Sequence, residues 1–386
     1  MCGYNRWRIR AESEMKKLGI YVHLPFCRRK CNYCDFCSFP DQNGEIMRQY
    51  TDELVRRIKS FAQKHNEYTV DTVYFGGGTP TLLPTECFSS LMNVISECFA
   101  VEKDAEISVE CNPATVGKGE FCTLRALGVN RLSIGLQSAN ENELRLLGRL
   151  HSFEDFCRCY FDARAAGFDN ISLDLMYGIP EQTLDSFENT LKKTVELSPE
   201  HISAYGLKIE EGTVFGKIKD SLVLPSEDEE FEMYLLCRKL LEESGYLRYE
   251  ISNFAKFGKE SRHNMRYWCL DDYIGFGVAA HSLVGGMRFG NSRDIDAFLR
   301  GEDIVAELSP VSQEERVKEY VMLGLRLQRG ISSEEYRNLS GREIHCDMPQ
   351  MRRFIEGGLL EEKDGRICFT DRGFFVSNAV LSELLY

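Results

Sequence analysis

Up to about residue 210, the chain alternates between two patterns of hydrophobic and polar positions. Short runs rich in branched and aromatic residues predict β-strands, and the longer stretches between them repeat apolar residues at helical spacing. The predicted strands are residues 19–24, 72–75, 106–110, 131–136, 171–175 and 201–207. Predicted helices include residues 46–65, 85–99, 153–166 and 183–196. This alternation indicates an α/β fold with a parallel sheet and helices outside it.

The pattern becomes less regular after residue 225. A helix over residues 226–243 and a strand over 246–251 are followed by an aromatic-rich loop and the glycine-rich segment 275–281. We interpret residues 226–308 as an α+β extension. The preceding core begins at Met15, because residues 1–14 differ from the rest and Met15 is an alternative start. We therefore predict a leader over 1–14 and a core domain over 15–225.

A separate C-terminal domain is predicted over residues 309–386. A capping box at Ser312 and Glu315 opens a helix, two short helices follow, and Asp364-Gly365 indicates a hairpin before a last helix from about Asp371. Three helices with a two-stranded wing suggest a winged-helix-like fold. Its charge is mixed, because Arg352 and Arg353 are offset by Glu356, Glu361 and Glu362. We expect a packing or docking domain in preference to a DNA-binding one.

Composition narrows the function further. The formal net charge is -13, which makes the chain a poor general binder of nucleic acid, and we expect no such partner. The sequence contains 15 cysteines, no apolar run of membrane-spanning length and no secretory signal pattern. We therefore expect a cytoplasmic protein with free or metal-bound thiols and without a transmembrane segment, for which peripheral membrane contact stays open.

Four cysteines lie close together directly after the first predicted strand. Cys27, Cys31 and Cys34 are followed by Cys37. Three sites fit this spacing: a four-cysteine zinc site, a four-thiolate iron–sulfur electron carrier, or a [4Fe–4S] cluster with three thiolates and one open iron. The third would leave an iron free to bind S-adenosylmethionine (SAM).

Polar residues at the ends of successive predicted strands favour the third site. Residues 76–80, Gly-Gly-Gly-Thr-Pro, follow the second strand and offer backbone amides for close approach to a ligand. Glu110, Gln137 and Asp174 end the next three strands, and Lys208 follows the sixth. In a parallel sheet these positions share one edge, where they can hydrogen-bond an amino group and ribose hydroxyls.

These motifs together resemble the radical SAM superfamily, in the branch of oxygen-independent coproporphyrinogen III oxidase and the heme chaperone HemW. The segments that carry the resemblance are residues 21–27, 31–36, 76–81, 110–113, 131–137, Arg149, 174–180 and 262–268. The resemblance implies a partial (β/α)6 TIM-type barrel, a low-potential electron donor and reductive cleavage of SAM to a 5'-deoxyadenosyl radical.

The resemblance also implies a set of site residues. It assigns Cys27, Cys31 and Cys34 to the cluster, and Cys37 departs from the oxidase spacing and is not expected to be a ligand. The implied SAM contacts are Tyr21, Gly77, Gly78, Thr79, Glu110, Gln137, Arg149 and Asp174. Tyr33, Lys208 and His281 fall where the oxidase branch has further SAM contacts.

Two features favour the chaperone branch over the oxidase branch. The segment before Cys27 is short, and residues 262–268 resemble the heme-associated His-Asn-x-x-Tyr-Trp motif of that branch. We therefore expect a heme-handling protein that delivers heme to an acceptor protein, with His263 as the heme-ligand candidate and His23 and His281 as rivals. A porphyrinogen oxidase is the alternative. A radical SAM enzyme that modifies RNA and a binding protein with a vestigial cluster are less favoured, because of the acidic charge and the intact strand-end residues respectively.

Overall fold

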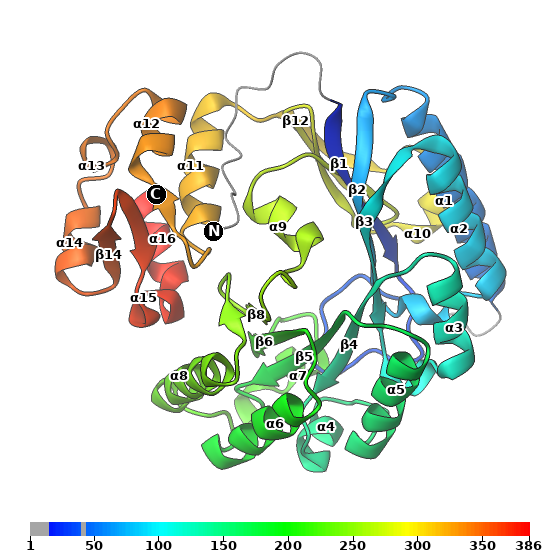
Figure 1. The fold of residues 1–386 in the computed structure, drawn as a ribbon, viewed down its shortest axis with the longest axis horizontal. Helices are drawn as coiled ribbons and strands as arrows, with labels where there is room; N and C mark the ends of the chain where they lie inside the picture. Colours follow the sequence, from blue (N-terminus) through cyan, green and yellow to red (C-terminus); the bar gives the residue numbers. More distant parts are fainter. Residues whose placement is uncertain (1–14, 40–43) are drawn as a thin grey trace.

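The computed structural model describes residues 15–39 and 44–386 (Figure 1). The predicted leader over 1–14 lies outside the described residues. All six predicted strands form, in the predicted order and mutually parallel, which confirms the α/β prediction. They are β1 Lys16–Leu24, β2 Tyr68–Gly77, β3 Ala100–Cys111, β4 Arg131–Gln137, β5 Ile171–Tyr177 and β6 His201–Gly206.

Helices cover the outer face of this sheet (Figure 1). They are α1 Glu45–Ala62, α2 Thr85–Cys98, α3 Lys118–Ala126, α4 Glu141–Leu146, α5 Phe153–Ala165 and α6 Leu184–Glu196. Alternate strand residues such as Val22, Phe75 and Ile134 are fully buried in one continuous hydrophobic core with these helices. Because strand side chains alternate between faces, the remaining positions are left for the inner face of the sheet.

The inner face is polar along its whole width. Ser133 of β4 lies between Glu110 of β3 and Ser172 of β5, and Ser172 is paired in register with His201 of β6. One layer further on, Asp174 is paired with Ser203. Hydrophobic burial therefore holds the strands from outside, while hydrogen bonds fill the interior.

The sheet does not close into a barrel. Beside β1 it continues through β9 Tyr273–Phe276, which is parallel to β1, and then through β10 His281–Val284, β11 Met287–Asn291 and β12 Val305–Pro310. Beyond β6 it continues through β8 Asn253–Ala255 and β7 Leu247–Arg248. Sequence patterns missed β9, because Gly275 within it and Gly277 directly after it weaken the strand signal.

The opening between β1 and β6 contains α9 Arg262–Trp268 (Figure 1). The expectation of a loop at this aromatic segment was wrong. Ser261 caps the helix by accepting from Asn264 N, and the Glu106 carboxylate on β3 accepts from the backbone amides of Arg262 and His263 at 3.1 and 3.0 Å. Arg266 forms a buried ion pair with Asp71. These long-range contacts, invisible to local periodicity, stabilise a helix of only seven residues.

The C-terminal region has the predicted winged-helix-like form and a hydrophobic cluster of its own, joined by Tyr234 of α8 Glu227–Glu243. The order helix, strand, three helices, hairpin agrees with that fold. The elements are α11 Gln313–Gly324, β13 Ile331–Ser332, α12 Ser333–Ser340, α13 Ile344–Asp347, α14 Met351–Glu356, β14 Leu360–Lys363, β15 Arg366–Phe369, α15 Asp371–Phe375 and α16 Ser377–Leu385. Among the described residues, no helix is long and apolar enough to cross a bilayer.

Candidate functional site

The cysteine loop follows β1 and rests on the glycine loop after β2. The amides of Gly78 and Thr79 donate to the carbonyl oxygens of Leu24 and Phe26 at 2.9 and 2.7 Å, and Thr79 Oγ1 lies 3.6 Å from Cys27 Sγ. A Cβ at Gly78 would lie 2.5 Å from the Phe26 carbonyl oxygen. Glycine is therefore required here, since any side chain would push the cysteine loop off its support.

A second anchor for the loop comes from the segment after α4. Arg149 Nη1 lies 3.6 Å from Cys31 Sγ, and Arg149 Nη2 donates to the Gly135 carbonyl oxygen at 2.8 Å. Asn32 Nδ2 donates to the Leu146 carbonyl oxygen at 2.8 Å. The predicted residues Arg149 and Thr79 thus hold two of the three predicted ligand cysteines from opposite sides.

The three cysteines predicted to hold the cluster are all free thiols in this loop. Cys27, Cys31 and Cys34 are partly exposed free thiols, and burial raises the pKa of Cys34 to about 11. Within residues 15–39 and 44–386, no three His, Cys, Asp or Glu side chains lie close enough to hold one metal ion.

Glu110 forms the centre of a polar cradle beside the cysteine loop. Its carboxylate accepts from Gly77 N at 3.0 Å and from the Tyr74 hydroxyl at 2.9 Å. Burial raises the pKa of Glu110 to about 7, although both hydrogen bonds oppose the shift. Gly77 has φ 113°, which favours glycine, and a Cβ there would lie 2.6 Å from the His23 ring. We call Gly77, Glu110, Gln137, Arg149 and Asp174 the strand-end cradle.

Asp174 is held on the inner face by three serines. Its carboxylate accepts from Ser203 at 2.8 Å, from Ser133 at 2.9 Å and from Ser172 at 3.5 Å, while burial raises its pKa. Gln137 ends β4 with φ 68°, a backbone conformation that is uncommon for residues other than glycine. The cradle therefore presents fixed carboxylate and amide groups of the kind that bind an amino group and hydroxyls.

Three predicted residues lie apart from this cradle. Lys208 is 83% exposed and pairs with Glu210 at 2.7 Å. Tyr33 is close to Arg149, but it lines a separate cavity together with His281. The structure thus groups most predicted SAM contacts on β2–β5 and in the loops beside them. It places Lys208 outside that group, and Tyr21 of β1 lines the separate cavity together with Tyr33 and His281.

His263 is fully buried, and both ring nitrogens are already hydrogen-bonded. Nδ1 lies 2.9 Å from Thr72 Oγ1 and Nε2 lies 2.8 Å from the Tyr267 hydroxyl, while the ring stacks on Tyr74. Burial lowers the pKa of His263 to about 3. Heme ligation by His263 stays a prediction, and in this conformation it would require one of the two hydrogen bonds to break, because an imidazole binds iron through one ring nitrogen.

The inner face also contains Arg131. This residue belongs to the 131–137 motif, but the sequence predicts no role for it. The side chain is buried, its Nε has no hydrogen-bond partner among the described residues, and charge interactions place it near Glu106 and Asp174. One feature of the sequence could have indicated it: Arg131 is a charged residue at the start of a predicted strand, residues 131–136, whose other residues are apolar or small. A buried cation here supplies positive charge between the acidic groups of the interior.

A cavity of about 610 Å³ opens beside the cysteine loop, between β1 and the β9–β11 strands. We call it the tyrosine cavity, since four tyrosines line it. Its lining residues are Tyr21, His23, Tyr33, Cys34, Asp35, Phe36, Cys37, Glu210, Tyr267, Tyr273, Ala279, His281 and Arg293. Its volume lies within the range of about 300–1,000 Å³ typical of pockets for one organic ligand. None of the five cradle residues lines it.

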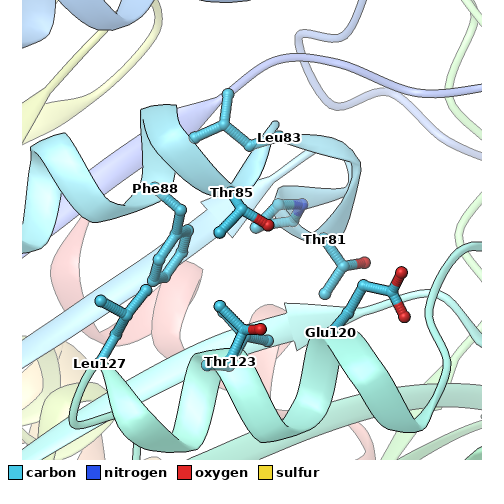
Figure 2. Close-up of a pocket in the computed structure, with 9 residues that line it drawn as sticks. Thr81, Leu83, Thr85, Phe88, Glu120, Thr123 and Leu127 are labelled. Carbon is cyan, nitrogen blue, oxygen red and sulfur yellow. The ribbon is translucent and has the colours of Figure 1, made fainter.

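A second, much smaller crevice of about 30 Å³ lies between α2 and α3. Figure 2 shows Phe88 and Leu127 on one side of it and Thr81 and Glu120 on the other. This volume suits a water molecule and not a cofactor. The tyrosine cavity is therefore the better candidate for an organic ligand.

Comparison with known proteins agrees with this geometry. Residues 21–194 match the model of the radical SAM superfamily, and residues 311–376 match that of the HemN C-terminal domain. The heme chaperone HemW of Bacillus subtilis (strain 168) is 35% identical over 378 residues, covering 95% of this chain and 99% of that protein. HemW of Escherichia coli (strain K12) is 32% identical, covering 96% and 99%.

The chain belongs to the HemW family.

Membership of this family confirms the resemblance drawn from the motifs. It places the chain in the radical SAM superfamily, which implies a [4Fe–4S] cluster and SAM as cofactors. The solved structure of coproporphyrinogen III oxidase (HemN) from Escherichia coli is similar to this HemW-family fold, with a TM-score of 0.85 and 26% identity. The similarity covers 96% of this chain and 90% of the oxidase, so the two branches share one architecture.

Proposed function

We propose that this protein binds heme in the tyrosine cavity and delivers it to an acceptor protein. The observation that carries the proposal is an aromatic cavity of about 610 Å³ that is lined by Cys34 and lies outside the cradle. Aromatic rings pack well against a planar porphyrin, and the open mouth suits a ligand that must leave again. The whole-length similarity to proteins named heme chaperones supports the same function.

For the cofactors, we propose that Cys27, Cys31 and Cys34 hold the cluster while Cys37 does not. For SAM, we propose contacts with Tyr21, Gly77, Gly78, Thr79, Glu110, Gln137, Arg149 and Asp174. When bound, the cluster supplies one-electron reduction of SAM. The chain's own part is positioning: Arg149 and Thr79 steady the cysteine loop, and the Glu110 carboxylate accepts from the SAM amino group.

The partners and the compartment belong to the same proposal. A low-potential electron donor must reduce the cluster, and a heme-accepting protein must take the cargo. We also propose a cytoplasmic location, because every cysteine that the structure describes is a free thiol, as expected in a reducing compartment. The donor and the acceptor are identified by these roles alone.

One anaerobic experiment tests this proposal. The cluster is reconstituted, the protein is titrated with hemin, and the hemin-loaded protein is mixed with an apo-hemoprotein while absorbance reports transfer. Stoichiometric hemin binding followed by transfer is the expected result. A wild-type protein that fails to bind hemin would contradict the proposal.

A porphyrinogen oxidase is the second candidate function. The observation in its favour is the close match to the oxidase fold, with a TM-score of 0.85. The reconstituted protein is given dithionite, SAM and coproporphyrinogen III, and the products are separated by chromatography. Protoporphyrinogen formation would replace the chaperone proposal with the oxidase, whereas SAM cleavage without porphyrinogen turnover agrees with the chaperone.

A further inference from the structure

The three histidines near the tyrosine cavity differ in whether they can accept an iron ion. His23 lies 2.9 Å from the Tyr21 hydroxyl through Nδ1 and 2.9 Å from the Cys37 carbonyl oxygen through Nε2. Both nitrogens of the buried His263 are engaged in the same way. By contrast, His281 is exposed, and among the described residues no hydrogen bond or ion pair holds either of its ring nitrogens. Of the three, His281 alone offers a free lone pair.

The strand pair β10–β11 gives the His281 ring a defined position. His281 is paired with Gly290 across the antiparallel ladder, and a Cβ at Gly290 would lie 2.9 Å from the ring atoms Cε1 and Nδ1. The imidazole therefore lies over bare backbone, in space that any other residue at 290 would fill. A ligand placed on a strand is held more rigidly than one on a loop.

The cavity that His281 lines has the other parts of a porphyrin site. Tyr267 and Tyr273 form an edge-to-face pair at 4.6 Å between ring centroids, and Phe36 is 68% exposed beside them in the lining. These rings offer apolar surface for a macrocycle. Arg293 is also in the lining, with a 68% exposed side chain whose Nη2 lies 3.8 Å from Asp35. An exposed guanidinium with one loose partner can bind a carboxylate in two-pronged fashion.

We propose that His281 is the axial ligand of the heme iron and that Arg293 binds a heme propionate. This inference rests on the proposed function and specifies its site. The bond formed is a coordinate bond from a neutral imidazole nitrogen to iron, with no change of oxidation state. His263 then serves as a packing residue that holds α9 against β2, and its partner Tyr267 forms part of the cavity wall.

The test compares histidine variants of the reconstituted full-length protein by hemin titration. We expect His281→Ala to weaken hemin binding by about tenfold or more and to shift the Soret band, and added imidazole to restore the band. Iron-free protoporphyrin IX, followed by fluorescence, should bind His281→Ala and wild type within about twofold, because it has no iron to ligate. His65→Ala is the matched control, since His65 is a partly exposed histidine that stacks on Phe61 and does not line the tyrosine cavity.

Arg293→Ala tests the second contact. It should weaken hemin and iron-free protoporphyrin IX alike, by about fivefold, while leaving binding of the porphyrin dimethyl ester unchanged. An equal loss for the ester would overturn the propionate assignment.

The outcomes separate the inference from the function on which it rests. Wild-type hemin affinity and spectrum in His281→Ala would overturn the axial assignment while the protein remained a heme binder, and loss in His263→Ala alone would return the role to that residue. Failure of wild type to bind hemin would contradict the proposed function itself. Circular dichroism and iron content of each variant distinguish ligand loss from misfolding.

Discussion

The strand-end cradle and the tyrosine cavity lie on either side of the cysteine loop and are built differently. In the cradle, the carboxylates of Glu110 and Asp174 are partly buried and hydrogen-bonded by neighbouring strands. In the cavity, His281 and Arg293 are exposed, and the Arg293 guanidinium lies 3.8 Å from its partner Asp35. Carboxylates that are already held in place by hydrogen bonds suit a small cofactor of fixed shape, whereas an open aromatic pocket suits a larger ligand that enters and leaves.

The largest effect expected concerns the loop shared by both regions. Cys27→Ser, Cys31→Ser or Cys34→Ser should each abolish the cluster, because a three-thiolate site has no spare ligand. Cys37→Ser is the matched control and should keep the cluster, since Cys37 is buried and is not one of the three proposed ligands. Iron and sulfide content with electron paramagnetic resonance after dithionite measures this. Cluster loss in Cys37→Ser would point to a four-cysteine site.

The next effect concerns α9, which separates the interior from the cavity. Arg266 pairs with Asp71, and it also donates to Thr72 Oγ1 at 3.2 Å and to the Asp272 carbonyl oxygen at 3.0 Å. Arg266→Ala leaves a buried carboxylate without its cation, and we expect a loss of about 3–5 kcal/mol in free energy of unfolding. Urea denaturation of the cluster-free protein measures it. A loss below about 1 kcal/mol would show that α9 is held mainly by other contacts.

Much of this comparison was predictable from sequence, and the rest depends on long-range contacts. The six strands follow from local periodicity, and Glu110, Gln137 and Asp174 follow from the rule that parallel strands end at one edge, whereas Arg149 was implied by the family resemblance alone. The position of α9 does not, because Glu106 and Asp71 hold it from strands more than 150 residues away. Likewise, Gly290 makes room for the His281 ring only through the β10–β11 pairing.

A pair of histidine variants sharpens the contrast between buried and open groups. His263→Ala removes both hydrogen bonds and leaves a void, and it should lower the free energy of unfolding by about 1–3 kcal/mol. His281→Ala should change it by no more than about 0.5 kcal/mol, because the exposed ring is unbonded. Urea denaturation under one condition compares them. Equal losses would show that His281 is part of the packed structure.

A further effect expected is a pH slope from the cradle. Burial raises the pKa of Glu110 from 4.5 to about 7, so between these values the folded protein retains a proton that the unfolded chain releases. The resulting stabilisation is full below about pH 4.5 and is lost as the pH rises through 7, by about 1.4 kcal/mol per pH unit.

Glu110→Gln should remove that slope. Burial also raises the pKa of Glu250 to about 7, so Glu250 contributes the same pH dependence of stability to wild type and variant. The difference between the two stability profiles therefore reports Glu110 alone. Urea denaturation of the cluster-free protein at several pH values measures the difference. Parallel profiles for wild type and variant would show that Glu110 ionises normally in the fold.

The central claim is that the cradle and the cavity are separate sites, one for SAM and one for heme. The most direct measurement is the SAM affinity of the reconstituted protein, determined anaerobically with and without saturating hemin. Separate sites predict that one hemin and one SAM bind together and that the SAM affinity changes by less than about twofold. Displacement of SAM by hemin would contradict the claim, because it would place both ligands in the same space.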